Sequence, residues 1–282
     1  MEILNSKCSA SIGSFNILRD NLGIVDLKKP SYSKVIIFSE DSNEQENAIF
    51  QIKNIVKISK RNAYGLLRLK LEDDEKARIN GILKCATNYE RNIKSYCKNR
   101  ICPICNGLKG VRLSKKYYNA ILKLEAPVLL TLTLPSVFKL ENNLNEVLNN
   151  MFNTYRKLKD SLRKKGIKII GIRKLEIVIN SQNRTFNPHF HLIIDNPQNE
   201  ASLVAEEWLK RNSSRGLKGQ NIQPIIEGDE MIILKYLSKP FVHFKNDNGD
   251  WKKDYEMLLM VYRATFKRRV FQNYGGFKSI EV

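Results

Sequence analysis

The succession of apolar segments after residue 127 constrains the fold of this chain more than any other feature. Four apolar runs are typical of strands, at 128–135, 168–180, 189–195 and 221–227. Between the first two, seven apolar residues recur at helical spacing before Gly166, which can end the helix: Leu144, Val147, Leu148, Met151, Tyr155, Leu158 and Leu162. Further helices are expected at 201–212 and at 229–239, where Pro240 stops the second one.

The order of these elements is β-α-β-β-α-β with one more helix. This order is that of the ferredoxin-like, split βαβ arrangement, so the sequence predicts an α+β fold. The strands that contain Glu176 and His189 would form its central hairpin. A last helix is expected at 251–273, capped by Gly275 and Gly276.

Four of the five cysteines lie close together just before this unit, at Cys85, Cys97, Cys102 and Cys105. The last three have the spacing C-x4-C-x2-C, and four thiolates suit a tetrahedral structural zinc ion. The alternative is a set of unrelated buried cysteines, which such clustering disfavours. Cys8 is distant, and we interpret it as a free thiol.

The charge of the chain indicates its partner. Lys and Arg number 48 against 29 Asp and Glu, a net charge of +19. Solubility needs a net charge of only about 2–8, so the excess favours a polyanion, with nucleic acid as the default. Lys109, Arg112, Lys115 and Lys116 fall in the most basic segment and are candidates for contact with the DNA backbone. A solvated helix face is the alternative for each of them.

Four regions are predicted: an accessory region of unknown role at 1–80, a zinc module at 81–120, a nuclease domain at 121–245 and a C-terminal helical segment at 246–282. Short strands are expected at 34–40 and 55–58 in the first region. The chain has no apolar run of about 18 residues, so no membrane span is expected. The N-terminus has no signal-peptide pattern, which favours a cytoplasmic location.

Two of the three histidines, His189 and His191, are spaced so that they share one face of a strand. Glu176 shares that face if the apolar faces of the two hairpin strands coincide. A pairing of Asn180 with Asn187, for example, would set Glu176 opposite His191. Two imidazoles and one carboxylate can hold a metal ion and leave positions for phosphate oxygens. The alternative is that one histidine packs in the core and the other is solvated.

Tyr236 lies in the helix expected after the fourth strand, and Lys239 follows on nearly the same helical face. A tyrosine beside a metal-bound phosphate can act as a nucleophile, and a nearby lysine can stabilise the phenolate or the transition state. For a tyrosine in a helix, a packing role is the alternative.

Together these motifs resemble the plasmid rolling-circle replication initiators of the HUH endonuclease superfamily. The resemblance covers about residues 85–240. It rests on five segments: CKNRICPIC at 97–105, LLTLTLP at 129–135, IRKLEIV at 172–178, NPHFHLII at 187–194 and KYLSK at 235–239.

The resemblance implies that Mg²⁺ or Mn²⁺, held by His189, His191 and Glu176, polarises the scissile phosphate of single-stranded origin DNA. Tyr236 would attack and keep the 5′ phosphate as a phosphotyrosine, and the freed 3′ hydroxyl would prime synthesis. A later strand transfer would close the circle. Host helicase and polymerase are the implied protein partners.

One position departs from the family pattern. Several members have a glutamate one helical turn before the tyrosine, which activates water to end the cycle, where this chain has Ile232. Asp229 and Glu230 are the alternatives for this role, although neither is in the expected place. Two rival functions stay open: a transposase or relaxase of the same superfamily, and a zinc-ribbon DNA-binding regulator without catalysis. Relaxases usually present a third histidine, and the only other one here, His243, follows the tyrosine helix. A regulator would leave the histidine pair without a purpose.

Overall fold

The computed structural model describes residues 42–134, 137–138, 144–212, 220–226, 232–233, 236–237, 239–245 and 254–277. Side chains are described from residue 54 onward, except at 137–138. The strand expected at 34–40, the thiol of Cys8 and the acids Asp229 and Glu230 lie outside the described residues.

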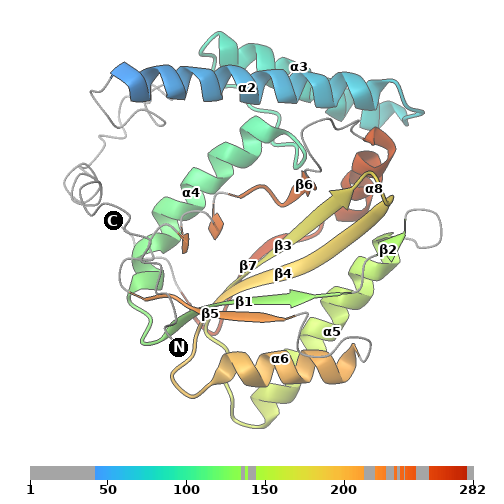
Figure 1. Cartoon of the computed structure of the whole chain (residues 1–282). Coiled ribbons are helices and arrows are strands. Elements are labelled where there is room, and N and C mark those ends of the chain that lie inside the picture. The colour runs from blue at the N-terminus through green and yellow to red at the C-terminus, as the bar shows by residue number, and fades with distance from the viewer. Residues whose placement is uncertain are drawn as a thin grey trace, which may run out of the picture.

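One mixed sheet organises the described part of the chain (Figure 1). Its strands are β1 (Pro127–Thr133), β2 (Val137–Phe138), β3 (Gly171–Asn180), β4 (Thr185–Asp195), β5 (Asn221–Pro224), β6 (Val242–Phe244) and β7 (Phe271–Tyr274). The main order is β5-β1-β4-β3-β6, while β2 pairs with β4 and β7 pairs with β3. The four strands expected from the apolar runs correspond to β1, β3, β4 and β5, and the mixed α/β class is confirmed.

The outer edge of β3 is divided between two short strands. β6 pairs with it in parallel at Ile177–Ile179, and β7 pairs with it antiparallel at Gly171–Lys174. The change of partner falls beside Glu176. The C-terminal part of the chain therefore completes the sheet around this residue.

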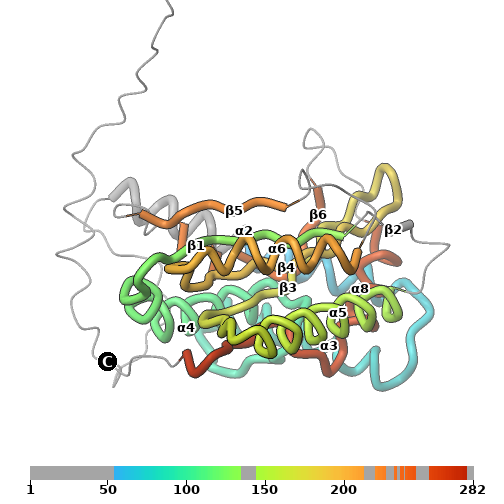
Figure 2. Tube along the Cα trace, turned by 90° about the horizontal axis from the view of Figure 1, so that it is seen from below, coloured from blue at the N-terminus to red at the C-terminus, as the bar shows by residue number. Residues whose placement is uncertain are grey.

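Two helices, α5 (Leu144–Lys164) and α6 (Glu200–Arg211), cover one face of the sheet (Figure 2). Six of the seven residues of the predicted helical stripe are buried in α5, and only Val147 is partly exposed. Trp208 of α6 is fully buried, and its indole N–H donates to the carbonyl oxygen of Thr133 at 3.0 Å. This bond fixes α6 against the end of β1.

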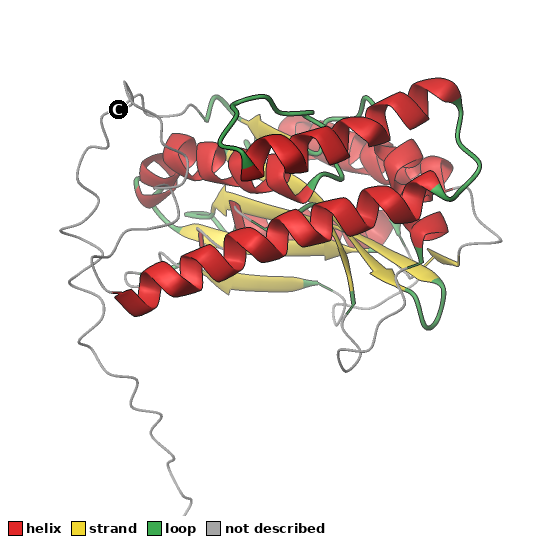
Figure 3. Cartoon of the chain, turned by 90° about the horizontal axis from the view of Figure 1, so that it is seen from above, coloured by secondary structure: helices red, strands yellow, loops and turns green. Residues whose placement is uncertain are grey.

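Three helices lie on the other side of the sheet: α2 (Ser42–Leu67), α3 (Asp73–Glu90) and α4 (Pro103–Leu122) (Figures 1 and 3). The strand expected at 55–58 is wrong, because these residues lie within α2. Val56, Ser59, Ala63 and Leu66 are buried at helical spacing, so the pattern that decides the structure extends beyond the short β-branched run.

The helix expected at 251–273 is also wrong in its extent. Helix α8 covers only Tyr255–Thr265, and strand β7 follows it. Lys267 has a φ of 59°, a left-handed conformation that an α-helix cannot contain, and β7 gains a ladder with β3. Gly275 and Gly276 adopt positive φ after this strand rather than at a helix end. None of the helices within the described residues combines the length and apolar composition that a membrane span requires.

Candidate metal centre and tyrosine

The β3–β4 hairpin brings the predicted metal ligands to one face of the sheet. Glu176 lies opposite His189. The example register, with Glu176 opposite His191, is wrong by two residues because the connection is tighter and Asn180 pairs with Thr185. A shift of two residues leaves every side chain on its face, so the predicted convergence is retained.

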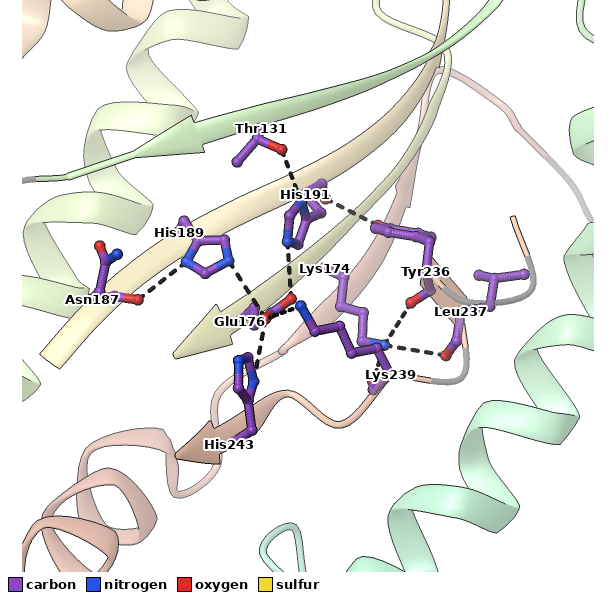
Figure 4. Close-up of polar contacts among 10 residues, drawn as sticks. All are labelled: Thr131, Lys174, Glu176, Asn187, His189, His191, Tyr236, Leu237, Lys239 and His243. Carbon is purple, nitrogen blue, oxygen red and sulfur yellow. Dashed lines mark hydrogen bonds and ion pairs between the residues drawn. The ribbon is translucent and has the colours of Figure 1, made fainter. Parts of the chain in front are cut away.

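Both imidazoles turn their Nε2 atoms toward the carboxylate of Glu176 (Figure 4). The distance is 2.9 Å from His191 to Oε2 and 3.7 Å from His189 to Oε1. The other ring nitrogens have partners of their own, since Nδ1 of His191 lies 3.0 Å from the hydroxyl of Thr131 and Nδ1 of His189 lies 3.1 Å from the carbonyl oxygen of Asn187. Such contacts orient histidines that bind metals.

The electrostatics of these groups favour a cation. Burial alone would raise the pKa of Glu176, but hydrogen bonds from His189, His191 and Lys239 outweigh it and hold the pKa well below its ordinary value. Burial lowers the pKa of His191, which favours the neutral ring that can bind a metal ion. Oε1 of Glu176 is approached by Nζ of Lys239 at 2.5 Å and by Nδ1 of His243 at 3.2 Å. One ionised carboxylate and two imidazole nitrogens within 4.8 Å of one another fit a divalent metal ion.

His243 is a third histidine at this centre, and sequence reasoning missed its place there. Strand β6 sets it beside Val178 of β3, and its Nδ1 lies 3.2 Å from Oε1 of Glu176. Burial lowers its pKa. No sequence pattern signals this contact, because β6 is short and its pairing with β3 is a tertiary interaction.

Tyr236 lies beside β3 and β4, the strands that carry the candidate metal ligands. Its phenol is 6% exposed, its ring centroid is 6.1 Å from that of His191, and its hydroxyl donates to the backbone carbonyl oxygen of His191 at 2.9 Å. Burial raises the pKa of the phenol well above its ordinary value. The tyrosine is therefore adjacent to the centre, with its hydroxyl held by the backbone.

Lys239 also reaches the centre, but it contacts the acid rather than the phenol. Its Nζ lies 2.5 Å from Oε1 of Glu176, and its side chain is 40% exposed. Ile232, which stands where several relatives in the resemblance have a glutamate, lies in a helical turn and is half-buried.

The four predicted zinc ligands converge in a second cluster. Cys85 comes from α3, Cys97 from the loop that follows, and Cys102 and Cys105 from the N-terminal end of α4. The sulfurs lie 3.6 Å apart for Cys97 and Cys105, 3.7 Å for Cys85 and Cys105, and 3.9 Å for Cys85 and Cys102. All four lie within 4.8 Å of one another, which fits one tetrahedral ion.

The predicted DNA contacts all lie on α4. Lys109, Arg112, Lys115 and Lys116 are exposed there, so their side chains are accessible to a ligand. Their role in binding DNA stays a prediction.

Comparison with known proteins shows that the central part of the chain is similar to one family. Residues 90–213 match the model of the Rep_1 family, whose members are replication proteins. This segment contains Glu176, both predicted histidine ligands and three of the four clustered cysteines, and it ends before Tyr236. No solved structure matches the chain with significance.

Curated relatives that match this chain carry the name Protein rep. The Staphylococcus aureus protein is 38% identical over 105 residues, which make up 35% of this chain and 44% of that protein. One from a Bacillus species is 30% identical over 106 residues, 35% of this chain and 33% of that protein. A third, from Streptococcus pneumoniae, is 25% identical over 206 residues, 66% of this chain and 62% of that protein. The chain thus spans less than two thirds of the length of each of these relatives. Residues 90–213 of this chain are thus similar to the replication proteins of the Rep_1 family, which supports the resemblance of the motifs to plasmid replication initiators.

Proposed function

We propose that this protein is a rolling-circle replication initiator that nicks and rejoins single-stranded origin DNA. The observation that carries the proposal is the convergence of Glu176, His189 and His191, with the hydroxyl of Tyr236 bonded to the backbone of His191. The relatives named Protein rep support a role in replication.

The order of the strands supports a nuclease domain of the HUH type. Strand β4 lies between β1 and β3, which α5 connects, and β5 returns to the side of β1 after α6. This order supports the proposed split βαβ unit. The two histidines then lie on a central strand, where neighbours on both sides fix their orientation.

The proposed reaction is a phosphoryl transfer to tyrosine. A divalent cation such as Mg²⁺ or Mn²⁺, held by Glu176, His189 and His191, would supply charge stabilisation at the phosphoryl oxygens. Tyr236 gives up its proton, its oxygen forms a bond to the phosphorus, and the bond from phosphorus to the 3′ oxygen breaks in line. The 3′ oxygen takes up a proton and becomes a primer, while the 5′ phosphate stays on the tyrosine. Attack by a 3′ hydroxyl on the phosphotyrosine reverses these steps.

The hydroxyl of Tyr236 must leave the carbonyl oxygen of His191 before it can attack. The raised pKa of the buried phenol means that proton loss needs positive charge nearby. Lys239 can supply it, because its long and partly exposed side chain already reaches the centre. For termination, the position one helical turn before the tyrosine holds Ile232 rather than a glutamate, so the acid that activates water would have to be Asp229 or Glu230.

The remaining assignments follow from the same function. A structural zinc ion would be bound by Cys85, Cys97, Cys102 and Cys105. The basic residues of α4 would follow the DNA backbone. We propose origin DNA, a host helicase and a host polymerase as partners, and the cytoplasm of a prokaryotic cell as the location.

A covalent adduct tests the proposal directly. The protein is incubated with single-stranded origin DNA and Mn²⁺, and the shifted band is mapped by peptide mass. We expect the DNA on Tyr236, and Tyr236→Phe should abolish the adduct. The matched control is Tyr64→Phe, since Tyr64 is 57% exposed on α2 and has no part in the proposed reaction. A wild-type protein that forms no adduct with any candidate origin would refute the nuclease.

A relaxase of the same superfamily is the second candidate. It is favoured by one observation, the position of His243 at 3.2 Å from Glu176, because relaxases usually bind their metal through three histidines. Adduct formation on a transfer origin, with none on a replication origin, would identify a relaxase.

A further inference from the structure

Lys174 is a buried lysine that the proposed reaction does not use. It lies on β3 opposite His191, and only 7% of the residue is exposed. Its Nζ donates to the backbone carbonyl oxygens of Tyr236 at 2.8 Å, of Leu237 at 3.1 Å, and of Lys239 (Figure 4). Three acceptors match the three hydrogens of an ammonium group, so no donor is left for DNA.

The three carbonyl groups belong to the end of the helical turns that carry the tyrosine. Carbonyl groups at a helix end have no partner within the helix, and together they carry a partial negative charge that a cation stabilises. Pro240 follows and has no N–H to offer. Strand β3 therefore provides the cap that the local sequence does not.

The side chain of Tyr236 is attached to the same pair of strands. Its hydroxyl donates to the carbonyl oxygen of His191, the residue directly opposite Lys174. The Nζ of Lys174 also lies 5.7 Å from the centroid of the tyrosine ring. Both the backbone and the phenol of Tyr236 are thus anchored on adjacent strand residues.

We infer that Lys174 is a positioning residue that clamps the tyrosine-bearing helical turns onto the metal-binding strands. It sets the distance from the phenol to His191 and Glu176 and takes no part in the chemistry. Lys239 differs, because its partly exposed side chain reaches the carboxylate itself. The catalytic consequence of the clamp rests on the proposed function, whereas its structural consequence does not.

Hydrogen exchange tests the clamp without any catalysis. In Lys174→Met, which keeps the length of the apolar stem and removes the ammonium group, amides in the peptide that contains Tyr236 and Leu237 should exchange at least about tenfold faster. The matched control is Lys159→Met. This lysine of α5 is also partly buried, but its Nζ lies 4.3 Å over the ring of Tyr274 rather than on the tyrosine turns. Equal exchange in both variants and the wild type would overturn the clamp.

Nicking kinetics then separate positioning from DNA contact. Lys174→Met should lower kcat on the order of 100-fold, because misplacement of a reacting group by about 1 Å has an effect of this size. The KM for DNA and the affinity for Mn²⁺ should stay unchanged. Lys174→Arg, which restores a charged donor, should recover part of both the rate and the exchange protection. A raised KM at constant kcat would overturn the inference in favour of a DNA contact.

Two further outcomes are distinguishable. If the wild type forms no adduct with DNA, the proposed function fails, and the exchange comparison still decides the clamp. If Lys174→Met does not fold, Lys174→Gln carries the same test, because its shorter neutral amide cannot satisfy three carbonyl groups.

Discussion

At the scale of single residues, the carboxylate of Glu176 is the centre of the candidate site. Four side-chain nitrogens approach it, from His189, His191, Lys239 and His243, at distances of 2.5–3.7 Å. A buried carboxylate is costly unless it is paired, and these neighbours keep it ionised. Three of the four contacts come from residues singled out in the sequence, and His243 comes from a pairing that only the fold reveals.

Replacement of one imidazole should separate catalysis from DNA binding. His191→Ala should abolish adduct formation, because it removes one of three metal ligands, while DNA affinity measured by anisotropy stays close to that of the wild type. Thr131→Val serves as a graded control, since loss of a contact behind a ligand costs roughly 10–100-fold in metal affinity. Full nicking by His191→Ala would remove the metal centre from the mechanism.

At the scale of helices and strands, two features join distant elements. Glu75 lies in the first turn of α3, where its carboxylate accepts the backbone N–H of Glu72 at 3.1 Å and two donors of Arg263 from α8 at 2.7 Å each. Gly65 of α2 lies against the ring of Tyr255 of α8, where a Cβ would come within 2.4 Å of ring carbons. Helix α8 is thereby tied to both N-terminal helices.

The ion pair of Glu75 predicts a pH-dependent stability. Its hydrogen bonds with Arg263 lower the pKa of the glutamate, so the stabilisation is fully present above the ordinary pKa of about 4.3 and is lost as the pH falls through the folded-state value. Glu75→Gln should lose at most about 1 kcal/mol at pH 7, because the side chain of Arg263 is 48% exposed. Urea unfolding at pH 7 and at acid pH measures this difference. A difference that stayed unchanged from pH 7 to acid pH would contradict this account.

The contact at Gly65 predicts that alanine destabilises the protein at this position, although alanine has the higher helix propensity. Gly65→Ala should destabilise the protein by about 1–3 kcal/mol, because the added methyl group overlaps the ring of Tyr255. Gly107→Ala in α4 is the matched control, since its nearest atom would lie 3.7 Å away and alanine should gain up to about 1 kcal/mol there. Thermal unfolding compares the two variants. Equal stabilisation of both would show that α2 and α8 do not pack in this way.

At the scale of the whole molecule, one apolar cluster connects the cysteine segment to the sheet. It contains Val56 of α2, Ile79 of α3, Cys102 at the start of α4 and Leu130 of β1. The thiol cluster therefore belongs to the same apolar core that supports β3 and β4, the strands that carry the candidate metal ligands. The boundaries predicted at residues 80, 120 and 245 stay predictions.

Loss of the thiol cluster should weaken the whole protein. Cys102→Ser should lose bound zinc and lower the melting temperature, because its sulfur is fully buried among the other ligands. Zinc content by mass spectrometry and thermal unfolding give the two readouts. A wild-type preparation that folds normally without zinc would exclude the structural ion.

The sequence by itself determined β1, α5, β3, β4, α6 and β5, because alternation and helical spacing follow directly from which face is buried. It also determined that His189, His191 and Glu176 share a face, since side chains in strands repeat every second residue and a register error of two leaves the face unchanged. The cluster of four thiols followed from local spacing in the same way.

Only the tertiary structure decided which partners meet across long stretches of chain. His243 reaches Glu176 because β6 pairs with β3, and Lys174 of β3 donates to the backbone of the turns that carry Tyr236. Both contacts depend on how short segments dock on β3. Likewise, residues 271–274 form a strand because an unpaired edge of β3 is available, a fact that local propensity does not contain.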